Sequence, residues 1–410
     1  MKKIRTINLQ SGAVSLFMVI FAMLLMSVVT ISFLRIMTSD QNQASQNDLS
    51  QSAYDSAQAG VEDAKRALLT YAQFCKTGTA AECEQYARDL ASTECNAAIF
   101  RSEVVKTSDS SDTAGGVGFP EVKVQQSSAV DENGGSIDAA LDQAYTCVTM
   151  TLDTDDYTAP LRANESKLIP LVSTAPFSTV TVQWFTRSDV ANTTGAVNLP
   201  TIAGDAKPLL LQANWPGDRP SVMRTQFMQV GDNFRLNDFD TRNDAGESNA
   251  NTIFLYPSSN GLGSSTELVL NDRDVRRSDT GNARPADQGS APTPIQCTST
   301  VSAGGYACSA TMRLPAPIRG GTSEASYLRL TPLYNASHIR VTLGGAQFKG
   351  VEPIVDSTGR ANDLFRRVQS RIDLYDTSFP YPDAAVDVNG NFCKDFGVTD
   401  TTYIAGTCNN

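Results

Sequence analysis

Residues 13–34, AVSLFMVIFAMLLMSVVTISFL, form an uninterrupted run without a charged side chain. A helix needs about 20 apolar residues to cross the hydrocarbon core of a bilayer, and this run just exceeds that length. The leader before it, MKKIRTINLQSG, carries Lys2, Lys3 and Arg5, whereas a single charge, Arg35, follows the run at once. Because positive flanks stay cytoplasmic, the sequence predicts a single-pass helix with its N-terminus inside and the bulk of the chain outside.

A second helical pattern follows the apolar run. Between residues 40 and 75, apolar or small side chains recur in steps of three or four and mark one face of an amphipathic helix: Leu49, Ala53, Ala57, Val61, Ala64, Leu68 and Tyr71. No proline occurs before Cys75, so nothing in the sequence interrupts the helix. From Ala13 to Cys75 such a helix is about 95 Å long.

The start of the apolar run resembles the class III signal of type IV prepilins. A short basic leader ends at Gly12, Ala13 begins the apolar run, and the run is longer than that of an ordinary secretory signal. In that family a membrane peptidase cuts after the glycine, so the resemblance implies cleavage between Gly12 and Ala13. The alternative is an uncleaved signal anchor. In both interpretations the helix remains on the mature protein.

Over about residues 1–75 the chain resembles minor pilins and pseudopilins, in which a glycine, a long apolar run, a Gln/Asn-rich turn and an alanine-rich acidic segment follow one another. Phe17 stands at the fifth position after the expected cleavage. Most pilins carry a glutamate there, which is thought to meet the N-terminal amine of a neighbouring subunit. The replacement resembles the special minor pilin at the tip of a pilus or pseudopilus. The resemblance implies four partners: other pilin subunits, the pilus assembly platform, prepilin peptidase and inner-membrane lipid.

Beyond residue 119 the pattern changes to a period of two, which is typical of half-buried antiparallel strands. The candidate strands are EVKVQQ, YTCVTMTL, TVTVQWF, KPLLLQANW, RTQFMQV, NTIFLY, TELVL, ACSATMRL, YLRLTPLY, HIRVTLG and RRVQSRIDLY. No helical pattern separates them, so a parallel sheet with crossover helices is not expected. The predicted fold class is α+β, with a long transmembrane and amphipathic helix packed on a large, antiparallel, sandwich-like extracytoplasmic domain. Ordinary pilins have only about four strands on the helix, and this excess favours a tip position.

Composition divides the chain into successive regions. They are a basic leader (1–12), a transmembrane helix (13–35), an amphipathic helical region (36–105), a Ser/Gly/Asp-rich loop (106–118), a β-rich domain (119–376) and a C-terminal tail that carries cysteines (377–410).

The chain has eight cysteines and no CxxC pair, which favours disulfides in an oxidising compartment over a zinc ribbon. Proximity favours two local bridges, Cys297 with Cys308 and Cys393 with Cys408. The remaining four are expected to pair among themselves: Cys75, Cys83, Cys95 and Cys147.

Signals for catalysis are weak. His338 is the one histidine, and no GxSxG, HExxH or nucleotide-binding motif occurs. Asp387, Asn389 and Asn391 resemble half of a calcium loop, but the glycine falls at the fourth position and no glutamate stands at the twelfth, so an Asx turn is favoured over a metal site. The sequence therefore predicts no cofactor and no enzymatic activity.

Other polar features have simple explanations. Asp153, Asp155 and Asp156 form a second acidic cluster, and three N-x-[ST] sequons begin at Asn164, Asn192 and Asn335. Arg366, Arg367 and Arg371 make one basic spot, which is interpreted as solvent-facing arginines rather than a contact for an anionic partner. A net charge of -11 and a pI near 4.7 disfavour nucleic-acid binding.

Together these patterns predict a minor pilin or pseudopilin of a type IV pilus or type II secretion-like system. It would sit in the cytoplasmic membrane and, after assembly, on the pilus or cell surface, where it would act in assembly and in adhesion to a host-surface ligand. A signal-anchored surface receptor or glycan-binding protein unrelated to pili is the alternative.

Overall fold

The computed structural model describes residues 11–96, 122–124, 143–202, 210–229, 250–270, 278–279, 292–319 and 326–374. The chain divides into two compact units. Unit 1 consists of Met1–Met150 and Val355–Ser370, and unit 2 consists of Thr151–Ile354 and Arg371–Asn410.

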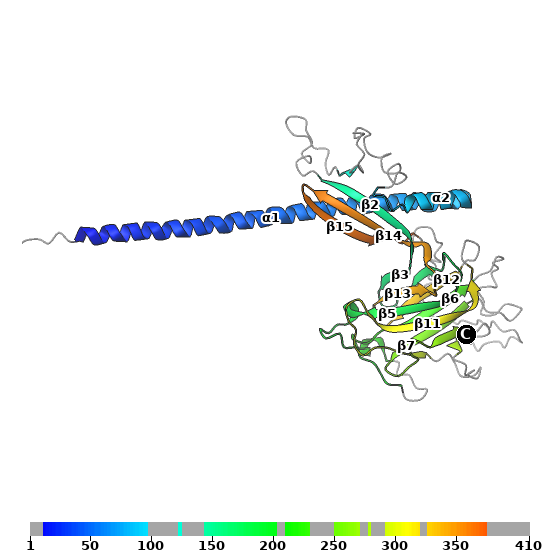
Figure 1. Ribbon diagram of the computed structural model, residues 1–410. Helices are drawn as coiled ribbons and strands as arrows, with labels where there is room; N and C mark the ends of the chain where they lie inside the picture. Colours follow the sequence, from blue (N-terminus) through cyan, green and yellow to red (C-terminus); the bar gives the residue numbers. More distant parts are fainter. Residues whose placement is uncertain are drawn as a thin grey trace, which may run out of the picture. The chain divides into compact units, whose positions relative to one another are not determined.

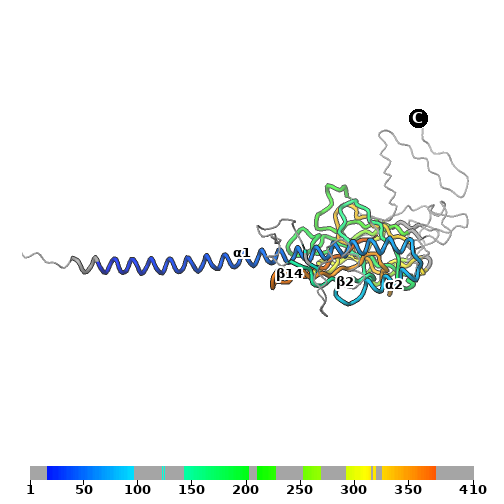
Figure 2. Tube along the Cα trace, turned by 90° about the horizontal axis from the view of Figure 1, so that it is seen from above, coloured from blue at the N-terminus to red at the C-terminus, as the bar shows by residue number. Residues whose placement is uncertain are grey.

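The described part of unit 1 contains two α-helices, α1 (Ser11–Thr77) and α2 (Ala80–Leu90). The whole of α1 is one unbroken helix (Figure 2), as the absence of proline predicts. The helical path stops at Gly78 and Thr79. Thr79 then caps α2 in a reciprocal capping box with Glu82, which satisfies backbone N–H groups that the first turn of a helix leaves open. These hydrogen bonds from Thr79 lower the pKa of Glu82.

A four-stranded sheet lies partly in unit 1, which holds its residues up to 150 and from 355 to 370. Its strand order is β1 (Val122–Lys123), β2 (Gln143–Thr154), β14 (Phe348–Ala361) and β15 (Leu364–Arg371). β1 pairs antiparallel with β2. A two-residue turn joins β14 to β15, and Asn362 in it has a φ of 49°, a left-handed conformation that asparagine tolerates. The second half of α1 lies along β2, β14 and β15 (Figure 1).

The amphipathic face predicted for α1 is buried on this sheet. Ala53, Ala57, Ala64 and Leu68 are completely buried, and Val61 is nearly so. Small side chains dominate the face, so helix and sheet approach each other closely.

Unit 2 contains two sheets. The six-stranded sheet has the order β3 (Asp156–Leu161), β13 (Ser337–Leu343), β5 (Phe177–Thr186), β11 (Tyr306–Ile318), β8 (Glu267–Leu270) and β9 (Ser278–Asp279). The five-stranded sheet has the order β10 (Thr293–Gln296), β7 (Ala250–Ser258), β6 (Val222–Gln229), β12 (Ser326–Leu333) and β4 (Lys167–Pro170). Among the described residues of unit 2, short 3-10 helices at Arg187–Asp189 and Gln212–Asn214 lie between strands.

The expectation of purely antiparallel sheets is wrong at two places. β10 pairs parallel with β7, and β11 pairs parallel with β8. The reason is visible in the chain order, because the chain alternates between the sheets as it passes through β7, β8, β10 and β11. Each parallel pair is therefore connected through a strand of the other sheet, so no crossover helix is needed.

One hydrophobic cluster in unit 2 includes residues from both sheets. Trp184 and Val182 come from β5, whereas Leu255 and Leu328 come from the five-stranded sheet, and all four are completely buried. The indole Nε1 of Trp184 donates to the carbonyl oxygen of Ser221 at 3.0 Å, so the one polar atom of this large side chain is satisfied.

Several predicted boundaries differ from the observed ones. The segment KPLLLQANW was expected to be a strand, but its described part, residues 210–215, contains a 3-10 helix. RRVQSRIDLY leaves the strand after Arg371, and the helical region expected to reach residue 105 has its last described helix end at Leu90. The β-rich region expected at 119–376 is shared, since residues 143–150 and 355–370 belong to unit 1.

Candidate functional site

The N-terminal half of α1 presents a continuous apolar surface. From Leu16 to Met37 every large apolar side chain is at least half exposed, and Phe17 is 77% exposed. By length and composition α1 qualifies as a membrane-spanning helix. Exposed apolar surface of this extent marks contact with lipid or with another protein.

Polar groups in this apolar half are satisfied within the helix. Ser27, Thr30 and Ser32 each donate their hydroxyl to a carbonyl oxygen three or four residues earlier, at 2.7–2.8 Å. A hydroxyl bonded in this way needs no water, which suits a helix surrounded by lipid or by other apolar helices.

The predicted processing and assembly positions lie at the start of α1. Gly12 and Ala13 lie in its first turn, and Phe17 follows Ala13 by about one turn. Phe17 presents an exposed apolar ring at the predicted assembly position.

Two glycines allow α1 to lie directly against the sheet. A Cβ on Gly60 of α1 would collide with Ser357 of β14, and a Cβ on Gly359 of β14 would collide with the backbone of Ala53 and Ala57. Position 359 therefore requires glycine if the helix is to keep its place on the sheet, whereas a side chain at position 60 would require the Ser357 hydroxyl to move.

Polar contacts reinforce this packing. The buried Tyr145 of β2 donates its hydroxyl to a carboxylate oxygen of Asp63 on α1 at 2.9 Å, and Arg366 of β15 donates to the hydroxyl of Ser50 at 2.8 Å. Burial raises the pKa of Tyr145, and the charge of Asp63 raises it further.

Among the described residues, the six cysteines form three disulfides. Cys75 bonds to Cys83 and links α1 to α2, and Cys95 bonds to Cys147 of β2. In unit 2, Cys297 bonds to Cys308, the bridge favoured by proximity. Cys393 and Cys408 lie outside the described residues.

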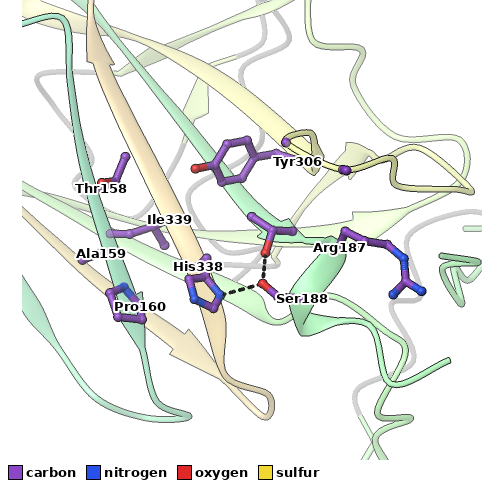
Figure 3. A pocket seen from close by; sticks show the side chains of 11 residues that line it. Thr158, Ala159, Pro160, Arg187, Ser188, Tyr306, His338 and Ile339 are labelled. Atoms are coloured by element: carbon purple, nitrogen blue, oxygen red, sulfur yellow. Dashed lines mark hydrogen bonds between the residues drawn. The ribbon is translucent and has the colours of Figure 1, made fainter. Parts of the chain in front are cut away.

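Unit 2 carries a pocket of about 620 Å³ on the six-stranded sheet (Figure 3). Its walls come from β3, β13, the 3-10 helix after β5, and the turn before β11: Thr158, Ala159, Pro160, Thr186, Arg187, Ser188, Ala303, Gly304, Tyr306, His338 and Ile339. Its volume lies in the range of roughly 300–1,000 Å³ that is usual for small-molecule sites.

Ser188 and His338 line this pocket and Asp189 contacts His338, but the three residues do not form a catalytic triad. His338 Nδ1 lies 2.6 Å from Asp189 Oδ1, and the same nitrogen lies 3.5 Å from Ser188 Oγ. A triad needs the acid and the nucleophile on opposite ring nitrogens, so that one nitrogen is oriented while the other takes the proton. This arrangement orients the imidazole but does not activate the serine.

Tyr306 closes another side of the pocket and lies close to a charged cluster. Burial raises the pKa of Tyr306, Arg340 opposes this, and Asp156 adds to it, so the hydroxyl stays protonated at neutral pH. Asp156 is paired with Arg340 at 2.6 Å and with Arg371 at 2.7 Å. Tyr306 can therefore act as a neutral aromatic surface and as a hydroxyl donor.

No protein-family model, curated protein or solved structure matches this chain.

The acidic features take part in local contacts. Asp155 accepts from Gln347 at 2.8 Å, and Asp156 is held by arginines. Burial raises the pKa of Asp153. Among the residues that the structure describes, no group of three or more His, Cys, Asp or Glu side chains could hold a metal. The half calcium loop of Asp387, Asn389 and Asn391 lies outside them.

The three arginines of the basic spot all have partners. Arg366 donates to Ser50, Arg367 pairs with Asp356 at 2.7 Å, and Arg371 joins Asp156 and Glu352. All three arginines are exposed, as the sequence predicts, but their local partners could not be read from the sequence.

The pocket was not predicted from the sequence, although a local signal was present for the helical turn that carries Ser188. Thr186 and Asp189 stand three residues apart and form a capping box, in which Asp189 accepts from the Thr186 backbone N–H at 2.7 Å. The sequence shows His338 only as the one histidine of the chain, without a catalytic motif around it. Its proximity to Ser188 and Tyr306 depends on strand pairing between distant segments.

Proposed function

We propose that this chain is a minor pilin or pseudopilin of a type IV pilus or type II secretion-like system, with a position at the tip and a role in assembly and surface adhesion. The observation that carries the proposal is the division of α1 into an exposed apolar first half and a second half buried on a four-stranded sheet. A helix on a sheet of about four strands is what the resemblance to pilins implies for the assembling part of the chain.

The physical mechanism is an exchange of apolar surroundings. In the bilayer the first half of α1 contacts lipid, and in a filament the same surface contacts helices of neighbouring subunits, so it remains shielded from water. The positive charges of the leader keep the N-terminus in the cytoplasm, so both units lie on the extracytoplasmic side of the membrane. Disulfides in both units fit an oxidising compartment, and the two sheets of unit 2 would form a sandwich-like extracytoplasmic domain.

Phe17 supports the tip position. Its ring cannot accept a hydrogen bond from the N-terminal amine of an adjacent subunit, whereas a glutamate carboxylate can. A subunit without this acceptor is suited to a place where no amine of an adjacent subunit needs a hydrogen bond, while the exposed ring of Phe17 can still pack against apolar helices of other subunits. Unit 2 adds bulk that a tip tolerates more easily than a filament shaft does.

The test replaces Phe17, and in a second chain Phe365, by a photoreactive phenylalanine analogue in cells that assemble the system. Both side chains are exposed, at 77% and 55%, but only Phe17 lies on the apolar half of α1. We expect crosslinks to other pilin subunits from position 17 and none from position 365. Equal crosslinking from both positions, or none from position 17 in assembled material, would contradict the proposal.

A signal-anchored glycan-binding receptor is the second candidate, and the pocket of unit 2 favours it. It would use α1 as an anchor alone. A receptor of this kind stays with the membrane fraction and keeps its leader, whereas a tip subunit appears in sheared filaments.

A further inference from the structure

The pocket of unit 2 has no part in assembly through α1, and its walls have a distinctive chemistry. In Figure 3 the ring of Tyr306, the imidazole of His338 and the hydroxyl of Ser188 border one space, which Thr158 and Pro160 extend. The side chain of His338 is 45% exposed, so the imidazole is accessible from solvent. An aromatic ring beside a few polar groups is the usual composition of a small-molecule site.

The charges at this pocket are already engaged. The Asp189 side chain is only 6% exposed and accepts from the backbone N–H groups of Thr186 and His338 at 2.7 and 3.0 Å. Arg187 donates to the carbonyl oxygen of Val190 at 3.3 Å, and its guanidinium points away from His338 (Figure 3). Among the described lining residues, Arg187 carries the one permanent charge, and its guanidinium is directed away from the space beside His338. That space therefore favours a neutral ligand.

Asp189 also prepares His338 for binding. Because Nδ1 faces the carboxylate, the ring orientation is set and Nε2 is directed away from Asp189. Among the described residues, no hydrogen bond engages Nε2. Nε2, the exposed hydroxyl of Ser188 and the hydroxyl of Thr158 can each bond to a ligand hydroxyl.

We infer that this pocket binds a neutral saccharide, with a C–H face of the sugar against Tyr306 and its hydroxyls on His338 and Ser188. Saccharides match the pocket because they carry apolar C–H faces and many hydroxyl groups but no charge. The inference deepens the proposed adhesion role and rests on unit 2 being exposed at the cell surface. It does not depend on assembly through α1.

The experiment uses the full chain, purified in detergent, on an immobilised set of glucose-, galactose- and mannose-terminated oligosaccharides beside sialylated and sulfated counterparts. Titration then follows with the best neutral probe. The variants are Tyr306→Ala, His338→Ala and Ser188→Ala. The matched control is Thr342→Ala, which is on the same face of β13 as His338 but does not line the pocket. Because unit 2 holds Trp184 and Trp215, the only tryptophans, their fluorescence checks that each variant is folded.

We expect a neutral probe to bind, with an affinity about tenfold lower for Tyr306→Ala and for His338→Ala, a smaller loss for Ser188→Ala, and no change for Thr342→Ala. Binding of charged probes only, equal affinities for all folded variants, or no binding of any probe would overturn the inference. Crosslinking from Phe17 is scored separately, so failure of the pocket and failure of the assembly proposal are distinguishable.

Discussion

Gly359 of β14 lies directly against the backbone of Ala57 of α1. An ideal Cβ on Gly359 would lie 2.8 Å from the Cα of Ala57 and closer still to its nitrogen, a separation that real Cβ atoms essentially never show. The exposed apolar half of α1 can serve as an assembly surface only if the other half is held firmly on unit 1. This glycine contact is therefore central to the proposed function.

Gly359→Ala should weaken the packing of α1 on its sheet. The added methyl group overpacks a rigid backbone contact, so we expect a destabilisation of unit 1 of about 1–3 kcal/mol. Hydrogen exchange of α1 amides around residues 53–64 measures it, and tryptophan fluorescence of unit 2 should stay unchanged. Gly217→Ala is the control, because no atom lies within 4 Å of a Cβ there. Equal protection of α1 in both variants would show that the contact is unimportant.

Tyr145→Phe should lower stability by about 1 kcal/mol, because it removes the hydrogen bond to Asp63. The folded unit raises the pKa of Tyr145 above its ordinary value of 10.0, through burial first and the charge of Asp63 second. The stability that depends on the protonated hydroxyl is therefore complete below pH 10 and is lost as the pH rises further. Helical circular dichroism above pH 10 should fall more steeply in the native chain than in Tyr145→Phe. Parallel curves would argue against this role.

Asp156→Asn should change the acid stability of unit 2. Burial alone would raise the pKa of Asp156, but hydrogen bonds from Arg371 and Arg340 outweigh it and hold the pKa below 3.8. The ionised Asp156 therefore stabilises the folded state above pH 3.8, and this stabilisation is lost as the pH falls through the folded pKa. Asp156→Asn lacks it, so the variant should be less stable at neutral pH and its stability should depend less on acid. Tryptophan fluorescence during acid titration measures both effects.

The pKa of Glu352 is shifted in the opposite direction to that of Asp156. Its burial raises the pKa above 4.5 despite the hydrogen bond from Arg371. Its contribution is complete below pH 4.5 and declines as the pH rises through the folded pKa, so Glu352→Gln should not reduce acid sensitivity. If Glu352→Gln and Asp156→Asn gave the same acid titration, the assignment of the acid effect to Asp156 would be wrong.

The two disulfides of unit 1 should differ in their contributions. Cys95 and Cys147 are 52 residues apart, whereas Cys75 and Cys83 are only 8 apart. Because the larger loop restricts the unfolded chain more, replacing both cysteines by serine should cost about 4 kcal/mol for the first pair and about 2–3 kcal/mol for the second. Denaturant unfolding of the two double variants gives the order, and the reverse order would contradict this entropic explanation.

Local patterns predict the helices and the long regular strands well. The apolar run from residue 13 and the alanine-rich helix face can be recognised from local spacing alone, and both lie in α1. The alternating segment TVTVQWF lies in β5, as predicted. β14 was not predicted, because Gly350, Pro353 and Gly359 interrupt the alternation of apolar and polar residues. Gly359 allows the backbone of α1 to approach this strand closely. The parallel pairs and the pocket depend on contacts between distant segments, which no local period encodes.

The mature N-terminus of the chain tests the central claim most directly. Mass spectrometry should be applied to protein isolated from cells with active prepilin peptidase. A chain that begins at N-methylated Ala13 is the result that the pilin account predicts, whereas a chain that retains Met1 and the whole leader would contradict it.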